Sequence, residues 1–481
     1  MAETLNNKVK KATKWSAITE LIVRLLVPIV NMVLARLLTP EAFGIVTTLT
    51  MVITFAEIFT DAGFQRYLIQ HEFTDEESKI KSTNVAFWSN LSVSLLIWGI
   101  IAIFSDAIAE LVGNPGLGHV LIVACASIPL AAFSSIQMAL YKRELDFKTL
   151  FKVRLISILV PIFVTIPLAF FLRSYWALVI GTLAQNSINA ILLTVFSKWK
   201  PSLYFSFSIL HGMLSFTIWS MVEQITIWLT NYVDVFIVGT MLSQYYLGLY
   251  KTSSTIVGQI MGLITAATTP ILFSSLSRLQ YNEDEFKNMF FKFQKLVGLL
   301  VIPLGVGIFC FSELVTNILL GSQWIEAGGF IGLWGLTSAL TIVLSHYSSE
   351  VYRAKGKPRL SVLAQLLHII FLWPTILIAV KYGFEILYIS RSVIRLELIF
   401  VNLVIMYVVM KISPFRMFNN ILPSCVAALA MGVFYFVLPR STSIIVSFLY
   451  VGLCTIVYFV IVCLFHQERE LLFNLKRNIK R

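Results

Sequence analysis

The stretch SIIVSFLYVGLCTIVYFVIVCLF, residues 443–465, carries no charged side chain. A bilayer core of about 30 Å needs roughly 20 apolar residues in a helix, so this stretch predicts one membrane span. Stretches of the same kind recur along the chain. The sequence therefore predicts an all-α polytopic membrane protein with about 14 transmembrane helices, near residues 15–37, 42–63, 84–104, 118–140, 155–172, 175–196, 210–238, 246–270, 296–311, 327–349, 360–380, 384–409, 420–438 and 443–465.

The composition of the whole chain excludes the ordinary soluble classes. Of 481 residues, 58% are hydrophobic and only 13% are charged, whereas a soluble domain carries about 25% charged residues. The five cysteines and six histidines show no metal-ligand spacing, so no metal or cofactor is expected. The polar, basic start leads into an apolar stretch that continues as a span, so we expect no secretory signal. The connections are too short for a soluble catalytic domain, and the chain is not expected to be an enzyme.

The net charge of +12 is mostly a topology signal. Cytoplasmic loops of membrane proteins collect lysine and arginine. With the N-terminus inside, the inner segments carry 29 of these residues, and the outer connections carry only Arg36, Arg173, Lys381 and Arg440. Both termini are therefore expected in the cytoplasm, with membrane lipids rather than nucleic acid as the partner of the basic segments.

Two short motifs indicate an internal repeat. Residues 38–45, LTPEAFGI, register with residues 242–249, LSQYYLGL, at an offset of 204. A second similarity pairs Tyr141 with Tyr352, each followed directly by a basic residue, at an offset of 211. Six spans per copy is an even number, so both copies insert in the same orientation, and a cleft between two lobes is expected. The predicted divisions are an N-terminal lobe at 1–200, a C-terminal lobe at 201–412, and two extra spans with a basic cytoplasmic tail at 413–481.

Four cations fall inside predicted spans, namely Arg24, Lys251, Arg391 and Arg395. A charge at a helix centre costs about 2.5–3.5 kcal/mol unless it faces protein or water. Internal pairing, of Glu20 with Arg24 and of Glu397 with Arg395, would be a purely structural explanation. Arg391 and Arg395 are one helical turn apart, however, and like charges so placed repel each other unless an anion lies near. The set is therefore a candidate anion site, and the planar fork of arginine suits phosphate.

Other residues within the spans are candidates for lesser roles. Asn31 shares a helix face with Arg24 and could contact sugars. Trp228 could stack on a sugar ring and Asn231 could bond to one, although packing is the commoner role of an aromatic side chain. Carboxylates in spans could couple transport to an ion, or could cap or pair near span ends, and the candidates for coupling are Glu57, Asp61 and Asp234.

Several of these stretches resemble the Wzx-type polysaccharide flippases. The strings are LARLLTPEAFG at 34–44, FTDAGF at 59–64, LYKRELDFK at 140–148, and Asp234 to Gly239 followed by LGLY at 247–250. The family belongs to the multidrug/oligosaccharidyl-lipid/polysaccharide (MOP) exporter superfamily, which also contains the MATE drug exporters. The subfamily resembled is the one linked to colanic acid and teichuronic acid. The resemblance implies a MATE-like pair of six-helix lobes with two further C-terminal helices.

The resemblance also implies a function, partners and a location. Such a flippase moves a polyprenyl-diphosphate-linked oligosaccharide across the bacterial plasma (inner) membrane by alternating access, in exopolysaccharide biosynthesis. Coupling to H⁺ or Na⁺ and association with a polysaccharide polymerase and other pathway proteins are open expectations. The alternative is a MATE-like antiporter that expels cationic drugs, but four intramembrane cations disfavour it. A membrane glycosyltransferase is a third hypothesis, and it lacks the large loops that such enzymes need.

Overall fold

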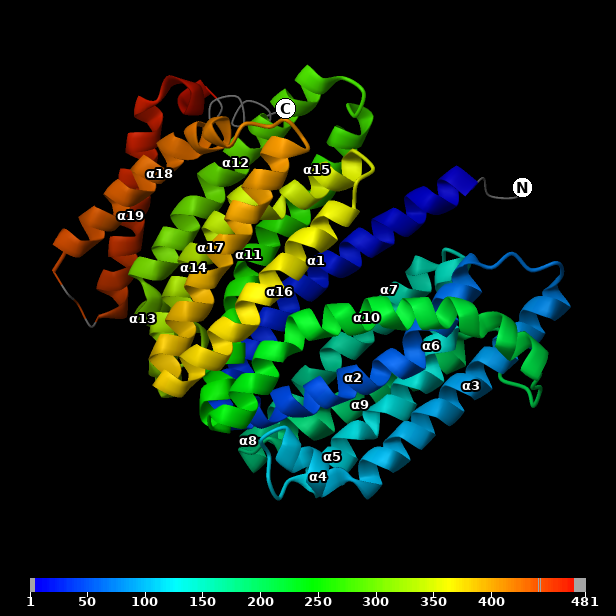
Figure 1. Ribbon diagram of the computed structural model, residues 1–481. Helices are drawn as coiled ribbons and strands as arrows, with labels where there is room; N and C mark the ends of the chain where they lie inside the picture. The colour runs from blue at the N-terminus through cyan, green and yellow to red at the C-terminus, as the bar shows by residue number, and fades with distance from the viewer. Residues whose placement is uncertain (1–4, 440, 442, 471–481) are drawn as a thin grey trace. The chain divides into compact units, whose positions relative to one another are not determined.

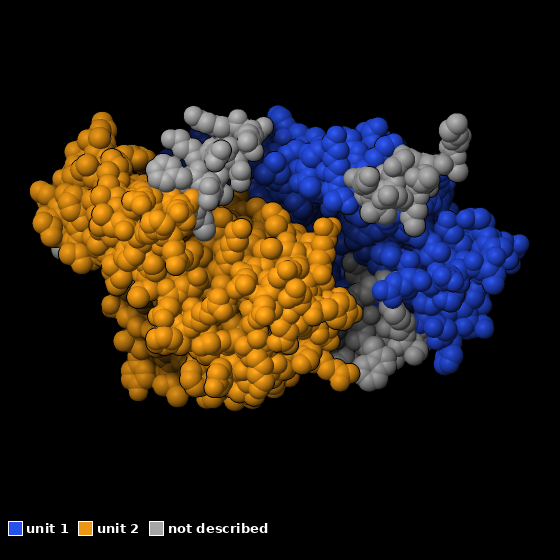
Figure 2. All heavy atoms as spheres, turned by 90° about the horizontal axis from the view of Figure 1, so that it is seen from above, with its two compact units in different colours: residues 1–248 blue, residues 249–481 orange. Residues whose placement is uncertain are grey.

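The computed structural model describes residues 5–439, 441 and 443–470, without the side chains of 5–10, 61–62, 66, 214–220 and 222–223. The regular elements of these residues are helices throughout, which confirms the predicted all-α class. The chain divides into two compact units, residues 1–248 and 249–481, called unit 1 and unit 2 (Figure 2). Residues 471–481, where the basic tail is predicted, lie outside the described part.

Unit 1 begins with two long helices joined by a tight turn. Thr39 caps the second of them by accepting a hydrogen bond from the backbone N–H of Ala42, and Pro40 occupies its first turn, which explains the LTPE sequence. The helices of unit 1 are α1 (Leu5–Leu37), α2 (Pro40–Gln70), α3 (Glu76–Ile103), α4 (Ser105–Leu111), α5 (Gly118–Cys125), α6 (Ser127–Arg143), α7 (Phe147–Val160), the π-helical turn η1 (Pro161–Thr165), α8 (Ile166–Leu172), α9 (Trp176–Phe196) and α10 (Phe207–Met241), followed by the first turn of α11 (Gln244–Arg278).

Unit 2 contains the rest of α11 and the helices that follow it (Figure 1). Within it α12 packs against α14 and α18, and α17 packs against α14 and α16. The elements are α12 (Glu283–Cys310), α13 (Ser312–Leu319), the 3₁₀ turn η2 (Ser322–Ala327), α14 (Gly328–Thr341), the π-helical turn η3 (Ile342–His346), α15 (Ser348–Ala354), α16 (Arg359–Ala379), the 3₁₀ turn η4 (Val380–Tyr382), α17 (Phe384–Val408), α18 (Pro414–Val437) and α19 (Ile444–Leu464).

Twelve helices of the described residues are long and apolar enough to cross a membrane. α17 is not among them because it carries four charged residues, and α10 includes residues whose side chains are not described. Ile445, Phe448 and Leu449 on α19 are exposed, as expected of side chains that face lipid. All fourteen predicted spans coincide with helical segments, and the protein is a multi-pass membrane protein. That every one of the fourteen crosses the bilayer stays a prediction.

Matching pairs of helices support the internal repeat. α3 and α12 each have 28 residues, and their first turns are capped by Asp75 and Asn282. Each ends at a phenylalanine, Phe104 or Phe311, and a short helix, α4 or α13, follows. The boundary between the two compact units differs from the predicted boundary between the lobes, because α10 lies alongside α2 and so belongs to unit 1 (Figure 1). The lobes predicted at 1–200 and 201–412 follow the two copies of the sequence repeat and not the boundary between the compact units. They stay a prediction.

Two buried glycines mark a close crossing within unit 1, between the first turns of α2 and α11. A Cβ atom at Gly44 would overlap the carbonyl oxygen of Gln244, and one at Gly248 would overlap the carbonyl oxygen of Pro40. The contacts are reciprocal because the two glycines hold equivalent positions in the repeated motif. The repeat detected in the sequence is therefore also a packing requirement, since only glycine lets two backbones approach so closely.

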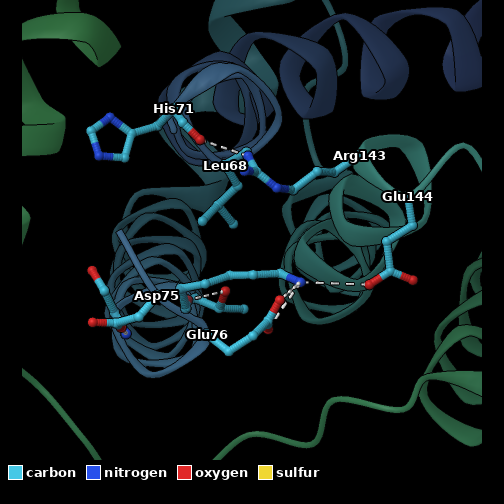
Figure 3. A network of polar contacts seen from close by, with 9 residues as sticks. Leu68, His71, Asp75, Glu76, Arg143 and Glu144 are labelled. Carbon is cyan, nitrogen blue, oxygen red and sulfur yellow. Dashed lines mark hydrogen bonds and ion pairs between the residues drawn. The ribbon is translucent and has the colours of Figure 1, made fainter. Parts of the chain in front are cut away.

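Arg143, from the LYKRE segment, closes the end of α2 (Figure 3). Its Nη1 donates hydrogen bonds to the carbonyl oxygens of Leu68 and His71, each at 2.7 Å, and its guanidinium lies 4.7 Å from the ring centroid of Phe73. Nearby, the Lys79 ammonium bridges Glu76 at 3.3 Å and Glu144 at 3.6 Å. Arg143 thus satisfies carbonyls that the end of a helix leaves without intrahelical partners.

We expect Arg143→Ala to destabilise unit 1. Hydrogen bonds to a charged group contribute about 1.5–3 kcal/mol each, so the thermal unfolding midpoint of the purified protein should fall clearly. Arg143→Lys should restore part of the loss. Lys142→Ala removes the same charge from the same helix end and is the matched control. An equal drop in the midpoint for both alanine variants would contradict the capping role.

Candidate functional site

The candidate site is built around two arginines of α17 that share one tryptophan of α14. The guanidinium carbon of Arg395 lies 3.9 Å from the ring centroid of Trp334, and that of Arg391 lies 5.0 Å from it. Cations over an indole face are attracted by its quadrupole. Arg391 and Arg395 are one turn apart, which brings both side chains to the same face of α17. The sequence prediction that they lie together is met, and Trp334 is what they share.

Each arginine of this pair donates a hydrogen bond to a neutral hydroxyl group. Arg391 donates from Nε to the hydroxyl of Tyr250 on α11 at 3.0 Å, and Arg395 donates from Nη1 to the hydroxyl of Ser338 on α14 at 2.7 Å. Within the described residues, Arg395 makes no ion pair. A guanidinium has five N–H donors, so Ser338 occupies one donor of Arg395. Arg395 is therefore held by a ring and a hydroxyl group, and neither of these contacts neutralises its positive charge.

Trp334 packs against a cluster of aromatic side chains. Phe330, fully buried one turn earlier on α14, contacts Trp334 edge to face at a centroid distance of 5.3 Å. Tyr250 stacks on Phe330 at 5.2 Å, and Tyr388 of α17 stacks on it at 5.8 Å. The cluster fixes the indole plane and also positions the hydroxyl that Arg391 uses. Such rigid positioning is what a preorganised binding site requires.

The pairing of Glu397 differs from expectation. Glu397 was a candidate partner for Arg395, but its Oε2 lies 3.0 Å from Nδ1 of His368 on α16. The two residues are only two positions apart on α17, which places them about 200° apart around the helix axis. The acid therefore faces α16 while Arg395 faces α14. His368 is a polar partner that the sequence reading did not identify, because a lone histidine in an apolar stretch gives no signal of its neighbour.

The other two cations of the candidate anion site are Lys251 in unit 2 and Arg24 in unit 1. Lys251 is partly buried on α11, directly after Tyr250. In unit 1, Arg24 makes the expected i to i+4 ion pair with Glu20 at 3.6 Å, and their side chains are 41% and 63% exposed. Asn31, two turns further along the same face of α1, lines a cavity of unit 1.

Trp228 packs on a neighbouring helix. Its indole N–H donates to the carbonyl oxygen of Met51 and to the hydroxyl of Thr54, both at 3.2 Å, and its ring lies 4.8 Å from that of Phe55. These contacts join α10 to α2. Asn231 is exposed, and its side chain bonds to the carbonyl of Ile227 on its own helix. The sugar contacts predicted for Trp228 and Asn231 stay predictions.

A conservative substitution separates packing from sugar contact at this position. Trp228→Phe keeps an aromatic side chain but replaces the indole with a smaller phenyl ring and removes the N–H, so we expect a stability loss of at least about 0.5–1.5 kcal/mol and unchanged polysaccharide export. Thr54→Val removes one acceptor of the same contact and serves as the matched variant. Unfolding midpoints and cell-surface polysaccharide provide the measurements. A fall in export at normal protein level in W228F alone would show that Trp228 meets the substrate.

The three acids proposed for ion coupling lie on α2 and α10. Glu57 is partly buried on α2, and Asp234 is buried on α10, with Oδ1 accepting from the backbone N–H of Val235 at 2.8 Å. The side chain of Asp61 lies outside the described residues. The described residues contain no cluster of His, Cys, Asp or Glu suited to a metal. The role of these three acids stays a prediction.

Comparisons with known sequences point to one family. A family profile described as "Polysaccharide biosynthesis protein" matches residues 33–328. The chain is 22% identical to "Lipopolysaccharide biosynthesis protein WzxC" of Escherichia coli strain K12 over 67% of this chain and 65% of that protein. It is 20% identical to "Teichuronic acid biosynthesis protein TuaB" of Bacillus subtilis strain 168 over 74% of each chain.

Solved structures agree on the fold. A lipid II flippase MurJ in an inward closed conformation superposes with a TM-score of 0.76 at 15% identity, over 95% of this chain and 99% of that one. An inward-facing MATE-family multidrug transporter of the MOP superfamily gives 0.60 at 14% identity, over 83% and 98%. The fold is therefore MurJ/MATE-like. Because the family profile covers more than half of the chain, this protein belongs to the polysaccharide biosynthesis protein family of Wzx-type MOP-superfamily transporters, which are not enzymes.

Proposed function

We propose that this protein is a flippase that moves polyprenyl-diphosphate-linked oligosaccharide repeat units across the bacterial plasma membrane by alternating access. Membership of a polysaccharide-exporting transporter family sets the general role. The observation that carries the specific proposal is the Arg391–Arg395 pair on Trp334. A diphosphate is the part of such a substrate that a cation pair inside a membrane protein would recognise.

The electrostatics of the pair favour an anionic ligand. Two guanidinium groups on one indole repel each other, and Arg395 makes no ion pair with the described residues. A diphosphate supplies that charge together with several oxygen acceptors, which guanidinium groups bind through paired hydrogen bonds. Trp334 covers one side of the pair, so the ligand approaches in the plane of the forks. Lys251 and Arg24 are proposed as further contacts along the substrate path.

The remaining features of the proposal concern topology and coupling. We propose fourteen spans arranged as two six-helix repeats, 1–200 and 201–412, with two further helices in 413–481, and both termini in the cytoplasm. The lipid tail stays in the bilayer while the charged head crosses. Glu57, Asp61 or Asp234 would bind H⁺ or Na⁺ if transport is coupled, and a polymerase on the outer face would consume the product.

Depletion of the protein tests this proposal. Complete lipid-linked repeat units should accumulate on the inner leaflet, as judged by their inaccessibility to glycan-modifying enzymes added outside intact spheroplasts. Truncated units would instead indicate a transferase, and normal outward delivery would contradict the proposal. Overexpression in an exporter-deficient strain tests the drug-antiporter alternative, because raised resistance to cationic drugs would favour that role.

A further inference from the structure

A half-open cavity of about 290 Å³ lies in unit 1, where α1, α7 with η1, and α9 meet. The π-helical turn η1 begins at Pro161, which lacks a backbone N–H, and such bulges displace the helix locally and often accompany functional sites. Gly181 lets α9 approach η1, since a Cβ there would overlap the hydroxyl of Thr165. The cavity is thus shaped by backbone features of two elements, η1 and α9.

The polar lining of this cavity is neutral. Its polar side chains are Asn31 from α1, Thr165 from η1, and Thr182 and Gln185 from α9, and its lining includes no charged residue. The hydroxyl of Thr182 donates to Leu178 of its own helix. The side-chain amides of Asn31 and Gln185 make no hydrogen bond to the described part of the protein. Each amide offers two donors and one acceptor oxygen, so the cavity combines both kinds of hydrogen-bonding group.

The chemistry of the lining selects the class of ligand. An ion would find no opposite charge in this neutral cavity. A purely apolar group would cover the two amides without giving them hydrogen-bond partners. A sugar ring avoids both penalties, because its hydroxyls can donate and accept while its C–H faces contact the valine, leucine and proline walls. Ligand pockets usually span roughly 300–1,000 Å³, so this cavity suits one ring rather than an oligosaccharide.

We infer that this cavity is a subsite for one neutral sugar residue, with Asn31 and Gln185 as its hydrogen-bonding residues. The inference rests on the proposed function, because it assigns part of the glycan to unit 1. The diphosphate contacts remain with the arginine pair of unit 2. Discrimination between neutral and acidic sugars follows from the uncharged lining.

The test uses the purified full-length protein in detergent, with glucose, galactose, N-acetylglucosamine and glucuronate as probes. At least one neutral sugar should raise the thermal unfolding midpoint of the wild type, and this increase should be lost in Asn31→Leu and Gln185→Leu. Sugars also stabilise proteins by exclusion from their surface. The signal is therefore the difference between wild type and variant at equal sugar concentration. Asn186→Leu, a neighbouring amide outside the cavity lining, is the matched control and should keep the increase.

The results separate this inference from the proposed function. Absence of a neutral-sugar effect that depends on Asn31 or Gln185, an equal effect of glucuronate, or an equal loss in N186L would overturn the sugar subsite. A stabilisation by NaCl over KCl that N31L abolishes would overturn it too, by indicating an ion. These outcomes are independent of the leaflet assay, which alone decides whether the protein flips lipid-linked glycan. If a neutral sugar raises the unfolding midpoint but depletion leaves the leaflet distribution of the lipid-linked glycan normal, the flippase function is contradicted while the sugar subsite stands.

Discussion

Replacing Arg395 with alanine is expected to abolish polysaccharide export while the protein still reaches the membrane. The substitution removes the guanidinium that lies nearest to Trp334 and its bond to Ser338. A bidentate phosphate contact comprises two charge-assisted hydrogen bonds of about 1.5–3 kcal/mol each. Because about 1.4 kcal/mol is a tenfold change, binding should weaken roughly a hundredfold or more. Surface polysaccharide at matched protein level is the measurement.

Three further variants make this prediction specific. Arg391→Ala should have an effect of the same kind, and Arg395→Lys should rescue only partly, since an ammonium keeps the charge but not the planar fork. Lys381→Ala removes one positive charge from an exposed position of unit 2 and should leave export unchanged. Normal export by properly expressed R391A and R395A would refute the diphosphate site.

Replacing Gly44 or Gly248 with alanine is expected to cause the largest loss of stability. Each added Cβ would overlap a backbone carbonyl oxygen, that of Gln244 or Pro40. A helix backbone cannot relieve this overlap by a change of rotamer, as a side chain can. Overpacking typically costs about 1–3 kcal/mol, and we expect the upper end or more at these two positions. Unfolding midpoints of the purified variants, and their yield in membranes, report the effect.

Helix glycines in open surroundings provide the controls. A Cβ at Gly258 of α11, or at Gly99 of α3, would meet nothing within 4 Å. Alanine is the better helix former by about 1 kcal/mol, so these variants should be as stable as the wild type or more so. Equal behaviour of G44A and G258A would show that the crossing of α2 and α11 tolerates separation, which contradicts the close packing described here.

The helical spans could be predicted from the sequence because the length of an apolar stretch is a local property. The same holds for the turn before α2, where Thr39 and Pro40 act on their immediate neighbours. The short helices α4 and α13 were not predicted, because their few residues lack the length and the uninterrupted apolar character of a span. A local pattern also could not show that α10 packs along α2, since that contact joins segments far apart in the chain.

The candidate site was predicted only in part for the same reason. The spacing of Arg391 and Arg395 on one helix was sufficient to identify them as a pair. The contact of Trp334 with both arginines depends on how α14 meets α17, which no local pattern in the sequence reveals. The partner of Glu397, His368, lies on α16 and could not be read from the sequence of α17. The unit 1 cavity requires the π-helical turn η1, which no simple periodicity reveals.

The most direct test of the central claim is flipping by the purified protein in proteoliposomes. A polyprenyl-diphosphate-linked glycan from the host, labelled on the sugar, would be incorporated with it, and exposure of the label to an impermeant glycosidase would be followed over time. The account predicts that nearly all of the label becomes accessible with the wild-type protein, and only about the initial outer half with R391A/R395A or with empty liposomes. Equal accessibility in wild type and the double variant, or none above empty liposomes, would contradict it.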